Sequence, residues 1–353
     1  MTIVNGKHQA EFDASWTGDN VAIRFALFHA TIDAVAAADG ELTGKWNVAS
    51  QTWGTSAQTF RATPISSPDP AARFDSKMLP GDPIDLHEAS TTWRVAFPES
   101  GIAKLELEQV APGVFNGTLL FSTGNVVYVA GNARGHRLRL SSLIGLSIYL
   151  FDAELDDAQK TLTGIWVAGP DIKWNETLVA TRSNDFEVAS TLKIAQRNQL
   201  FAMSQLAPYA SKPLIIEVGG SWCDTCKHAA AALVDIYKRE HPHGLEIVSL
   251  TYEWTDDNEY NKRQAVEFKR TYRIPWEVIA VDGSLEKAWD VIPPGLDGVD
   301  VSGFPITLFV NRDGTIRSIH ASFAGPENPR EHQRWRDMYD REARALVDSD
   351  ETK

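Results

Sequence analysis

The chain has 353 residues, of which 43% are hydrophobic and 23% charged, and its formal net charge at pH 7 is −13. This length allows two domains with separate hydrophobic cores, and the composition is that of an ordinary globular protein. The acidic balance argues against nucleic acid and anionic membrane surfaces as partners, and no apolar run reaches the length of a transmembrane segment.

Residues 1–185 are predicted to form an all-β domain, either an antiparallel barrel or a sandwich. Alternating apolar and polar residues, as in Val21–Phe25 and Val126–Val129, are typical of strands with one buried face. Three dipeptides of a type that favours hairpin turns separate such segments: Asn5-Gly6, Asp39-Gly40 and Asn116-Gly117. The stretch 65–83, rich in Ser, Pro and Asp, is predicted to be a long loop.

A short pattern occurs twice in this region. Leu42-Thr-Gly-Lys-Trp46 is followed much later by Leu162-Thr-Gly-Ile-Trp166, and each copy comes after an acidic turn region. One interpretation is that two similar halves make up one barrel or sandwich. The other is that the chemistry of a turn followed by a strand recurs by chance, and the sequence favours neither.

No catalytic group of residues is visible in the first domain. Three histidines stand alone in the sequence, which is typical of structural or solvated side chains: His29, His87 and His136. The tryptophans of the region are expected in the core rather than around a ligand cavity: Trp16, Trp46, Trp53, Trp93, Trp166 and Trp174.

Residues 186–353 are predicted to form a second domain of the α/β class. The stretch 183–190 is the expected linker, and 191–206 the expected entering helix. The following elements are then predicted: strand 212–218, helix 223–239, strand 245–252, helix 258–272, strand 276–280, short helix 284–289, strands 306–310 and 316–321, and helix 329–347. After the entering helix, this is a β-α-β-α-β-β-α order with one additional strand and one additional short helix.

The only two cysteines, Cys223 and Cys226, lie where the first of these strands passes into a helix. Helix N-termini carry unpaired N–H groups and a partial positive charge, so the pKa of Cys223 should be lower than that of a free cysteine. One thiol can attack a substrate disulfide and the other can resolve the mixed disulfide. We expect Cys223 to be exposed and Cys226, one turn into the helix, to be covered. The negative charge of Asp224 should oppose the lowered pKa of Cys223, and Lys227 should offset Asp224.

The cysteine count also limits the cofactors. A zinc site requires about four ligands, and there is no second cysteine pair. Covalent haem attachment requires a histidine directly after the second cysteine, where this chain has Lys227. We therefore expect no cofactor other than a redox-active Cys223–Cys226 disulfide.

Residues 191–347 resemble the thioredoxin superfamily, and within it the TlpA-like thiol–disulfide oxidoreductases. The resemblance lies in Trp222-Cys223-x-x-Cys226 after a strand and in Gly303-Phe304-Pro305 before another strand. It implies a thioredoxin-like fold, protein thiols and disulfides as substrates, and an upstream redox partner protein. It also implies an extracytoplasmic location (periplasm or cell envelope). No signal peptide is visible in the chain, and a cytoplasmic location stays open.

Part of the first domain resembles the N-terminal extension of some TlpA-like proteins, as in 115–124 and 138–142. In such proteins one or two further strands precede the first Asn-Gly turn. Met1 lies close to that turn here. Whether a barrel can close is therefore open at this point.

The resemblance assigns roles to further residues. Glu217 lies within an apolar strand, where burial should raise the pKa of its carboxyl group, and it corresponds to the acid that accepts a proton from the resolving cysteine. The alternative is a carboxylate on a solvated strand face. Pro305 is expected to follow a cis peptide bond, face the cysteines and hold substrate backbone. Trp222 and Phe304 are expected to flank the substrate groove, although aromatic residues there are as often packing residues.

A second function remains open. Copper-delivery proteins of the same superfamily use a cysteine pair with three residues between them and a distant histidine. His320 is the candidate histidine here, but only two residues separate the cysteines. The alternative is thus a redox-responsive or copper-binding thioredoxin-like module whose β domain binds a ligand or partner.

Overall fold

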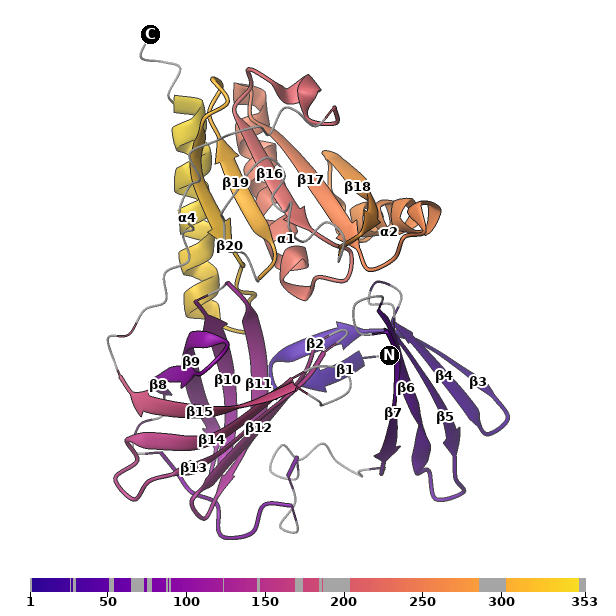
Figure 1. The fold of residues 1–353 in the computed structure, drawn as a ribbon, viewed down its shortest axis with the longest axis vertical. Coiled ribbons are helices and arrows are strands. Elements are labelled where there is room, and N and C mark those ends of the chain that lie inside the picture. Colours follow the sequence, from indigo (N-terminus) through magenta and orange to yellow (C-terminus); the bar gives the residue numbers. More distant parts are fainter. Residues whose placement is uncertain are drawn as a thin grey trace. The chain divides into compact units, whose positions relative to one another are not determined.

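The computed structural model describes residues 2–25, 27, 30–50, 54–64, 73–74, 78–86, 88, 90–122, 124–144, 147–168, 174–183, 186, 204–285 and 303–348. The chain divides into two compact units, one of Met1–Ser122 with Val127–Val188 and one of Thr123–Val126 with Ala189–Lys353 (Figure 1). Most of the predicted linker and most of the helix at 191–206 lie outside the described residues, as does most of the short helix at 284–289.

The first unit contains β-strands only among its named elements. A hairpin turns at Gly6, whose φ of 63° suits a tight turn, as Asn5-Gly6 predicted. The first seven strands are β1 (Thr2–Asn5), β2 (His8–Glu11), β3 (Asp13–Thr17), β4 (Asn20–Phe25), β5 (Ala30–Ala36), β6 (Leu42–Ser50) and β7 (Gly54–Ala62). Strands β3 to β7 form an antiparallel sheet in sequence order.

The other eight strands of this unit form a closed barrel. They are β8 (Ser90–Phe97), β9 (Gly101–Ala111), β10 (Val114–Phe121), β11 (Val126–Arg134), β12 (Arg137–Ile144), β13 (Ser147–Leu155), β14 (Thr161–Ala168) and β15 (Trp174–Arg182). Strand β15 pairs with β8 and so closes the ring without a strand before Met1. Large side chains such as Trp93, Phe115 and Trp166 are buried in the core, so the barrel is filled rather than hollow.

The turn predicted at Asn116-Gly117 is wrong. Both residues lie inside β10 and pair with Glu108 and Leu107 of β9. A Cβ atom at Gly117 would lie 2.9 Å from the carbonyl oxygen of Glu106, closer than Cβ atoms come to such atoms. The glycine is therefore explained by close packing of neighbouring strands, which a turn dipeptide in the sequence does not distinguish.

The repeated pattern has the same local structure in both places. Gly44 of β6 pairs with Ala34, and Gly164 of β14 pairs with Ala153, each across an antiparallel hairpin. A Cβ atom at either glycine would overlap a carbonyl oxygen of the neighbouring strand. The recurrence is therefore structural, but the copies belong to different sheets and are not halves of one barrel.

One buried charge is held on the barrel. Asp152 of β13 is 5% exposed and accepts hydrogen bonds from Arg137, at 2.6 and 2.9 Å, and from Arg139, at 2.6 and 3.1 Å. Burial by itself would raise the pKa of Asp152, but the hydrogen bonds from the two arginines outweigh it, and the pKa is lowered. The carboxylate thus ties β12 to β13.

Asp152→Ala is expected to destabilise the first unit by about 2–3 kcal/mol, because it leaves two arginines without their shared partner. Asp157→Ala is the matched control, since the side chain of Asp157 is 95% exposed and its contact with His136 spans 3.5 Å. That control should change stability by less than about 0.5 kcal/mol. Urea unfolding of the full chain measures the stability change of each variant. Equal changes for Asp152→Ala and Asp157→Ala would contradict the stabilising role of Asp152.

The second unit is a mixed five-stranded sheet with helices, in agreement with the predicted α/β class (Figure 1). The strand order is β18-β17-β16-β19-β20. The elements are a short 3-10 helix (Ala207–Tyr209), β16 (Leu214–Gly219), α1 (Asp224–Glu240), a second 3-10 helix (His241–His243), β17 (Glu246–Glu253), α2 (Asn258–Thr271), β18 (Glu277–Ser284), β19 (Ile306–Val310), β20 (Ile316–Ala321) and α4 (Pro329–Asp348). Strands β16, β17 and β18 are parallel, and β19 and β20 are antiparallel to their neighbours.

The local sequence explains the ends and faces of the helices. The carboxylate of Asp257 accepts the backbone N–H of Tyr260 at 3.0 Å and caps α2. Helix α4 buries Trp335, Tyr339 and Leu346 at helical spacing, which gives it one apolar face. None of the described helices is both long enough and apolar enough to cross a membrane.

Candidate active site

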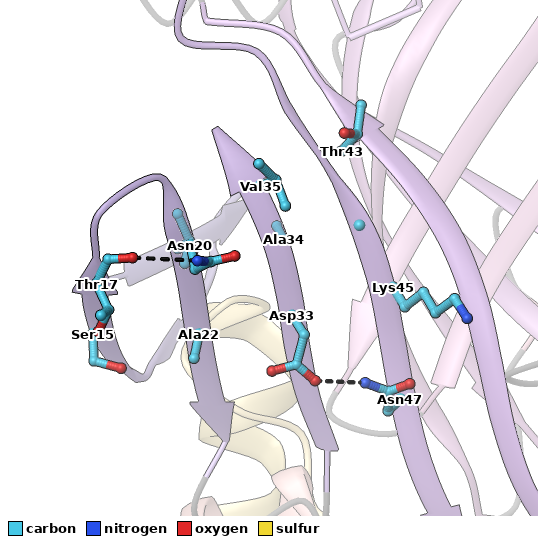
Figure 2. Close-up of a pocket in the computed structure, with 12 residues that line it drawn as sticks. Ser15, Thr17, Asn20, Ala22, Asp33, Ala34, Val35, Thr43, Lys45 and Asn47 are labelled. Carbon is cyan, nitrogen blue, oxygen red and sulfur yellow. Dashed lines mark hydrogen bonds between the residues drawn. The ribbon is translucent and has the colours of Figure 1, made fainter. Parts of the chain in front are cut away.

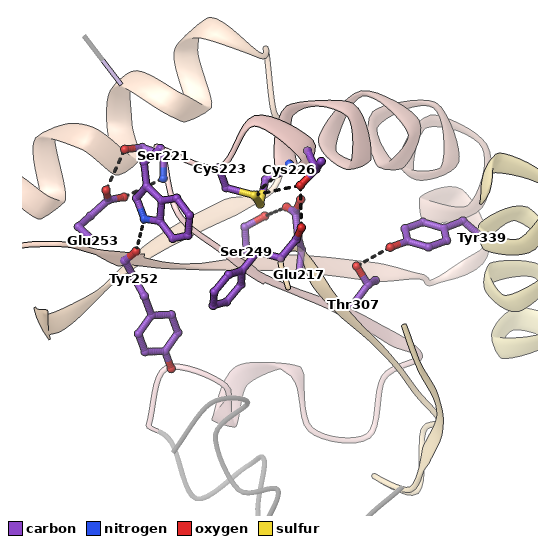
Figure 3. The surroundings of a disulfide bond; sticks show 12 residues. Glu217, Ser221, Cys223, Cys226, Ser249, Tyr252, Glu253, Thr307 and Tyr339 are labelled. Atoms are coloured by element: carbon purple, nitrogen blue, oxygen red, sulfur yellow. Dashed lines mark hydrogen bonds between the residues drawn. A yellow bond between two sulfur atoms is a disulfide. The ribbon is translucent and has the colours of Figure 1, made fainter. Parts of the chain in front are cut away.

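The two cysteines form a disulfide at the start of α1 (Figure 3). Cys223 is the N-cap residue, with extended backbone geometry, and its sulfur accepts the backbone N–H of Cys226 at 3.1 Å. All six residues of the preceding strand β16 are buried. Cys223 therefore lies between a buried strand and the N-terminus of a helix, whose partial positive charge stabilises a thiolate.

The predicted exposure of Cys223 is wrong for the oxidised protein. Cys223 is 5% exposed and Cys226 is 1% exposed. As the N-cap, the sulfur of Cys223 turns back over the first turn of the helix instead of pointing into solvent. The greater reactivity predicted for Cys223 must therefore come from its position at the helix N-terminus rather than from exposure.

The segment with Pro305 lies against the cysteine motif. The peptide bond between Phe304 and Pro305 is cis. The hydroxyl group of Thr225 donates to the carbonyl oxygen of Phe304 at 2.6 Å, and its oxygen lies 3.5 Å from the sulfur of Cys223. Thr225 therefore joins the two segments, a role that sequence reasoning missed because the two residues are far apart in the chain.

The two aromatic residues expected beside the cysteines contact each other. The rings of Trp222 and Phe304 lie edge to face with centroids 5.5 Å apart. The indole N–H of Trp222 donates to the carbonyl oxygen of Tyr252 at 2.8 Å. Trp222, Phe304 and Thr225 thus connect the cysteine loop, the end of β17 and the segment before β19.

The charges next to the cysteines pair as predicted. The ammonium group of Lys227 contacts the carboxylate of Asp224, and the side chains are 18% and 3% exposed. The two opposite charges lie one helical turn apart on α1. Lys227 therefore offsets the negative charge that Asp224 places beside Cys223.

Glu217 lies beneath the disulfide on the sheet (Figure 3). It is 2% exposed, so the alternative of a solvated strand face is wrong. Burial raises the pKa of Glu217 to about 7, and a hydrogen bond from the hydroxyl group of Ser249, at 2.7 Å, works against this rise. A carboxyl group with this pKa can take up or release a proton near neutral pH.

A second buried carboxylate, Glu253, holds the loop that leads to the cysteines. It is 0% exposed and accepts the backbone N–H and the hydroxyl group of Ser221, each at 2.9 Å. Sequence reasoning did not identify Glu253, because its position at the end of an apolar strand does not show which distant backbone group it meets. The loop before Trp222 is fixed by β17 through this contact.

His320, the candidate copper ligand, lies in an aromatic environment. It is 2% exposed on β20, with ring centroids 5.7 Å from Phe309, 6.4 Å from Trp335 and 6.2 Å from Tyr339. Burial lowers the pKa of His320 to about 4, so it is neutral at pH 7. Within the described part of the chain, no three His, Cys, Asp or Glu side chains form a group that could hold a metal ion.

The first unit offers a depression on the sheet β3–β7 with a volume of about 380 Å³ (Figure 2). Its lining contains polar side chains, among them Asp33, Lys45 and Asn47, beside apolar ones such as Val21 and Val35. The side chain of Asn47 donates to Asp33 at 2.8 Å. Of the other candidates, the ring of His136 is exposed beside Asp157. His29, His87 and Trp53 lie outside the described residues.

The predicted core role of the tryptophans is confirmed for Trp46, Trp93 and Trp166, which are buried. Trp16 departs from this prediction, because it is 55% exposed on the edge strand β3. Trp174 begins β15.

In the reduced protein, iodoacetamide at neutral pH is expected to label Cys223 well before Cys226. The sulfur of Cys223 lies at the helix N-terminus, which favours its thiolate, whereas Cys226 is 1% exposed. Mass spectrometry of a labelling time course measures the order. Earlier labelling of Cys226 would reverse the assignment of nucleophile and resolving thiol.

No family model matches the sequence, and no curated protein shows significant sequence similarity to it. Among solved structures, the chain is similar to a putative thiol:disulfide interchange protein DsbE from Chlorobium tepidum, with 13% identity over 40% of this chain and 84% of that one and a TM-score of 0.31. It is similar to a secreted Mycobacterium tuberculosis disulfide oxidoreductase, with 15% identity over 40% and 86% of the two chains and a TM-score of 0.28. A third is the thioredoxin domain of a Bacteroides vulgatus thiol-disulfide oxidoreductase, with 16% identity, coverage of 38% and 83%, and a TM-score of 0.27.

Proposed function

We propose that this protein is a thiol–disulfide oxidoreductase that exchanges disulfides with protein substrates. The observation that carries the proposal is the Cys223–Cys226 disulfide at the N-terminus of α1, joined through Thr225 to the segment that contains Pro305. This arrangement combines a stabilised thiolate, a second thiol one turn away and a nearby backbone segment that a peptide could meet.

The exchange needs no other oxidant than the substrate disulfide. The Cys223 thiolate attacks one substrate sulfur, so a mixed disulfide forms and the other substrate sulfur leaves as a thiolate. The Cys226 thiol then loses its proton and its sulfur attacks Cys223, which releases the second substrate thiolate and restores the Cys223–Cys226 disulfide. The substrate gains two electrons and the cysteine pair loses two, and a redox partner protein reverses this change.

Glu217 is proposed to accept the proton of Cys226, since it is buried behind the motif and its pKa is about 7. Pro305 is proposed to hold substrate backbone, and Trp222 and Phe304 to border the bound peptide. A TlpA-like character and an extracytoplasmic location are proposed from the sequence resemblance. Fractionation of cells that express the natural gene tests the location.

Reduction of insulin disulfides with dithiothreitol tests the activity. Wild-type protein should accelerate the reaction, and Cys223→Ser should fall to the rate of dithiothreitol alone. Val266→Ala, at a residue of α2 that is 67% exposed, should keep the wild-type rate. Equal rates for wild type and Cys223→Ser would reject the proposal. Stoichiometric copper(I) binding that His320→Ala abolishes would support the copper-binding alternative.

A further inference from the structure

A row of polar residues crosses the sheet of the second unit, on the face that is covered by α1 and α4. Ser249 of β17, Glu217 of β16, Thr307 of β19 and His320 of β20 are register partners on successive strands. Each is at most 2% exposed. Polar residues in such a place require hydrogen-bond partners, because an unpaired buried polar group is costly.

Helices α1 and α4 cover this face. An ideal Cβ at Gly219 would lie 2.6 Å from the sulfur of Cys226, so this sulfur lies directly over β16. Glu217 projects from the same face two residues earlier, about 7 Å along the strand. From α4, the hydroxyl group of Tyr339 donates to the hydroxyl oxygen of Thr307 at 2.7 Å.

The hydrogen bond from Ser249 to Glu217 has a fixed direction. The indole N–H of Trp276, directly before β18, donates to the hydroxyl oxygen of Ser249 at 2.8 Å. An indole can only donate, so the single hydroxyl proton of Ser249 is left for the carboxylate oxygen Oε2 of Glu217, 2.7 Å away. Oε2 is therefore always the acceptor of this hydrogen bond.

The other carboxylate oxygen, Oε1, is different. It is buried and has no hydrogen-bond partner among the described residues. A proton that Glu217 takes up therefore goes to Oε1, because Oε2 already accepts the proton of Ser249.

The groups that surround Glu217 from the other elements are uncharged at neutral pH. They are the hydroxyl groups of Ser249 and Thr307, the hydroxyl group of Tyr339, whose pKa is raised chiefly by burial, and, one strand further, His320, whose pKa is about 4. Cys226 from α1, whose sulfur lies over Gly219 of the same strand as Glu217, is part of a disulfide. Burial and the hydrogen bond from Ser249 therefore dominate the ionisation of Glu217.

We propose that Trp276 and Ser249 are positioning residues that keep Oε2 of Glu217 as a hydrogen-bond acceptor and reserve Oε1 for the proton exchanged with Cys226. The inference rests on the proposed function, in which Cys226 is the resolving thiol. In this step the S–H bond of Cys226 breaks and an O–H bond forms at Oε1. The new thiolate attacks the sulfur of Cys223 in the mixed disulfide, so the Cys223–substrate S–S bond breaks and the substrate sulfur leaves as a thiolate. Neither Trp276 nor Ser249 touches the reacting atoms.

Infrared titration of the oxidised protein tests this inference without any turnover, because the disulfide sulfurs do not titrate. The protonated carboxyl band that Glu217→Gln removes should titrate near pH 7 in the wild type. Ser249→Ala should move its midpoint upward by about one unit, because it removes a hydrogen bond that favours the carboxylate. Trp276→Phe should shift the midpoint in the same direction by a smaller amount. Ser249→Thr, which keeps the hydroxyl group, should have the wild-type midpoint.

The double variant Ser249→Ala/Trp276→Phe is the control for folding, because it leaves no indole N–H without an acceptor. It should show the carboxyl shift of Ser249→Ala with higher stability than that single variant. In insulin reduction, the acid limb of the pH profile should shift together with the carboxyl midpoint. An unchanged carboxyl midpoint in Ser249→Ala or Trp276→Phe would overturn the inference even in an active protein. If the variants shift the carboxyl midpoint but the wild-type protein does not reduce insulin, the positioning role of Ser249 and Trp276 would be supported and the proposed function rejected.

Discussion

Cys226→Ser is expected to lose turnover and to accumulate a mixed disulfide between Cys223 and the substrate. Cys223 keeps its place as N-cap of α1, so attack on a substrate disulfide remains possible. The resolving sulfur is missing, because serine cannot displace a disulfide sulfur under these conditions. The first step then proceeds and the second stops.

Intact-mass spectrometry after mixing the reduced variant with oxidised insulin measures the trapped species. Cys226→Ser should carry nearly one covalent adduct per chain, and insulin turnover should fall to the rate of dithiothreitol alone. Cys223→Ser is the matched control, because Cys226 is 1% exposed and should form far less adduct. A larger adduct on Cys223→Ser than on Cys226→Ser would assign attack to the other thiol.

Glu217→Gln and His320→Gln are expected to change the slope of the free energy of unfolding against pH in opposite directions. The pKa of Glu217 is raised from 4.5 to about 7 by burial, and the pKa of His320 is lowered from 6.5 to about 4, also by burial. Glu217 therefore contributes stability that is full below pH 4.5 and is lost as the pH rises toward 7. His320 contributes stability that is full above pH 6.5 and is lost as the pH falls toward 4.

Between pH 4.5 and 6.5, Glu217 and His320 change the free energy of unfolding in opposite directions as the pH rises, and these two changes cancel in the wild type. In Glu217→Gln only the contribution of His320 remains, so the free energy of unfolding should rise with pH by about 3 kcal/mol across this window. His320→Gln leaves only the carboxyl group, so it should fall by about 3 kcal/mol.

Urea unfolding of the oxidised protein at several pH values measures these slopes, and the difference from the wild type removes the contributions of all other groups. Asp157→Ala serves as the exposed control and should run parallel to the wild type. Curves for Glu217→Gln and His320→Gln that both run parallel to the wild type would show that the two buried groups keep ordinary pKa values.

Local patterns in the sequence determined most elements of the second unit. The strand before the cysteines, the helix that Cys223 caps and the strands 306–310 and 316–321 lie where predicted, because β-branched runs and helical spacing act over a few residues. The sequence favoured burial of Glu217, because its neighbours in β16 are apolar, but it left a solvated strand face as the alternative, which the structure excludes. In the first unit the same reasoning indicated strands but did not distinguish a barrel from a sandwich, since the period of two is the same in both.

Only the tertiary structure decided which distant groups meet. Asn116-Gly117 has the composition of a turn, yet the neighbouring strands place it inside β10. Cys223 was expected to be exposed, yet the hydrogen bond to its sulfur turns it inward. Ser249 and Trp276 gave no signal in the sequence, because their relation to Glu217 exists only after β16 and β17 pair in register. A one-residue shift of that pairing would turn Ser249 to the other face, so side-chain packing across the sheet, rather than local preference, sets the surroundings of the buried carboxyl group.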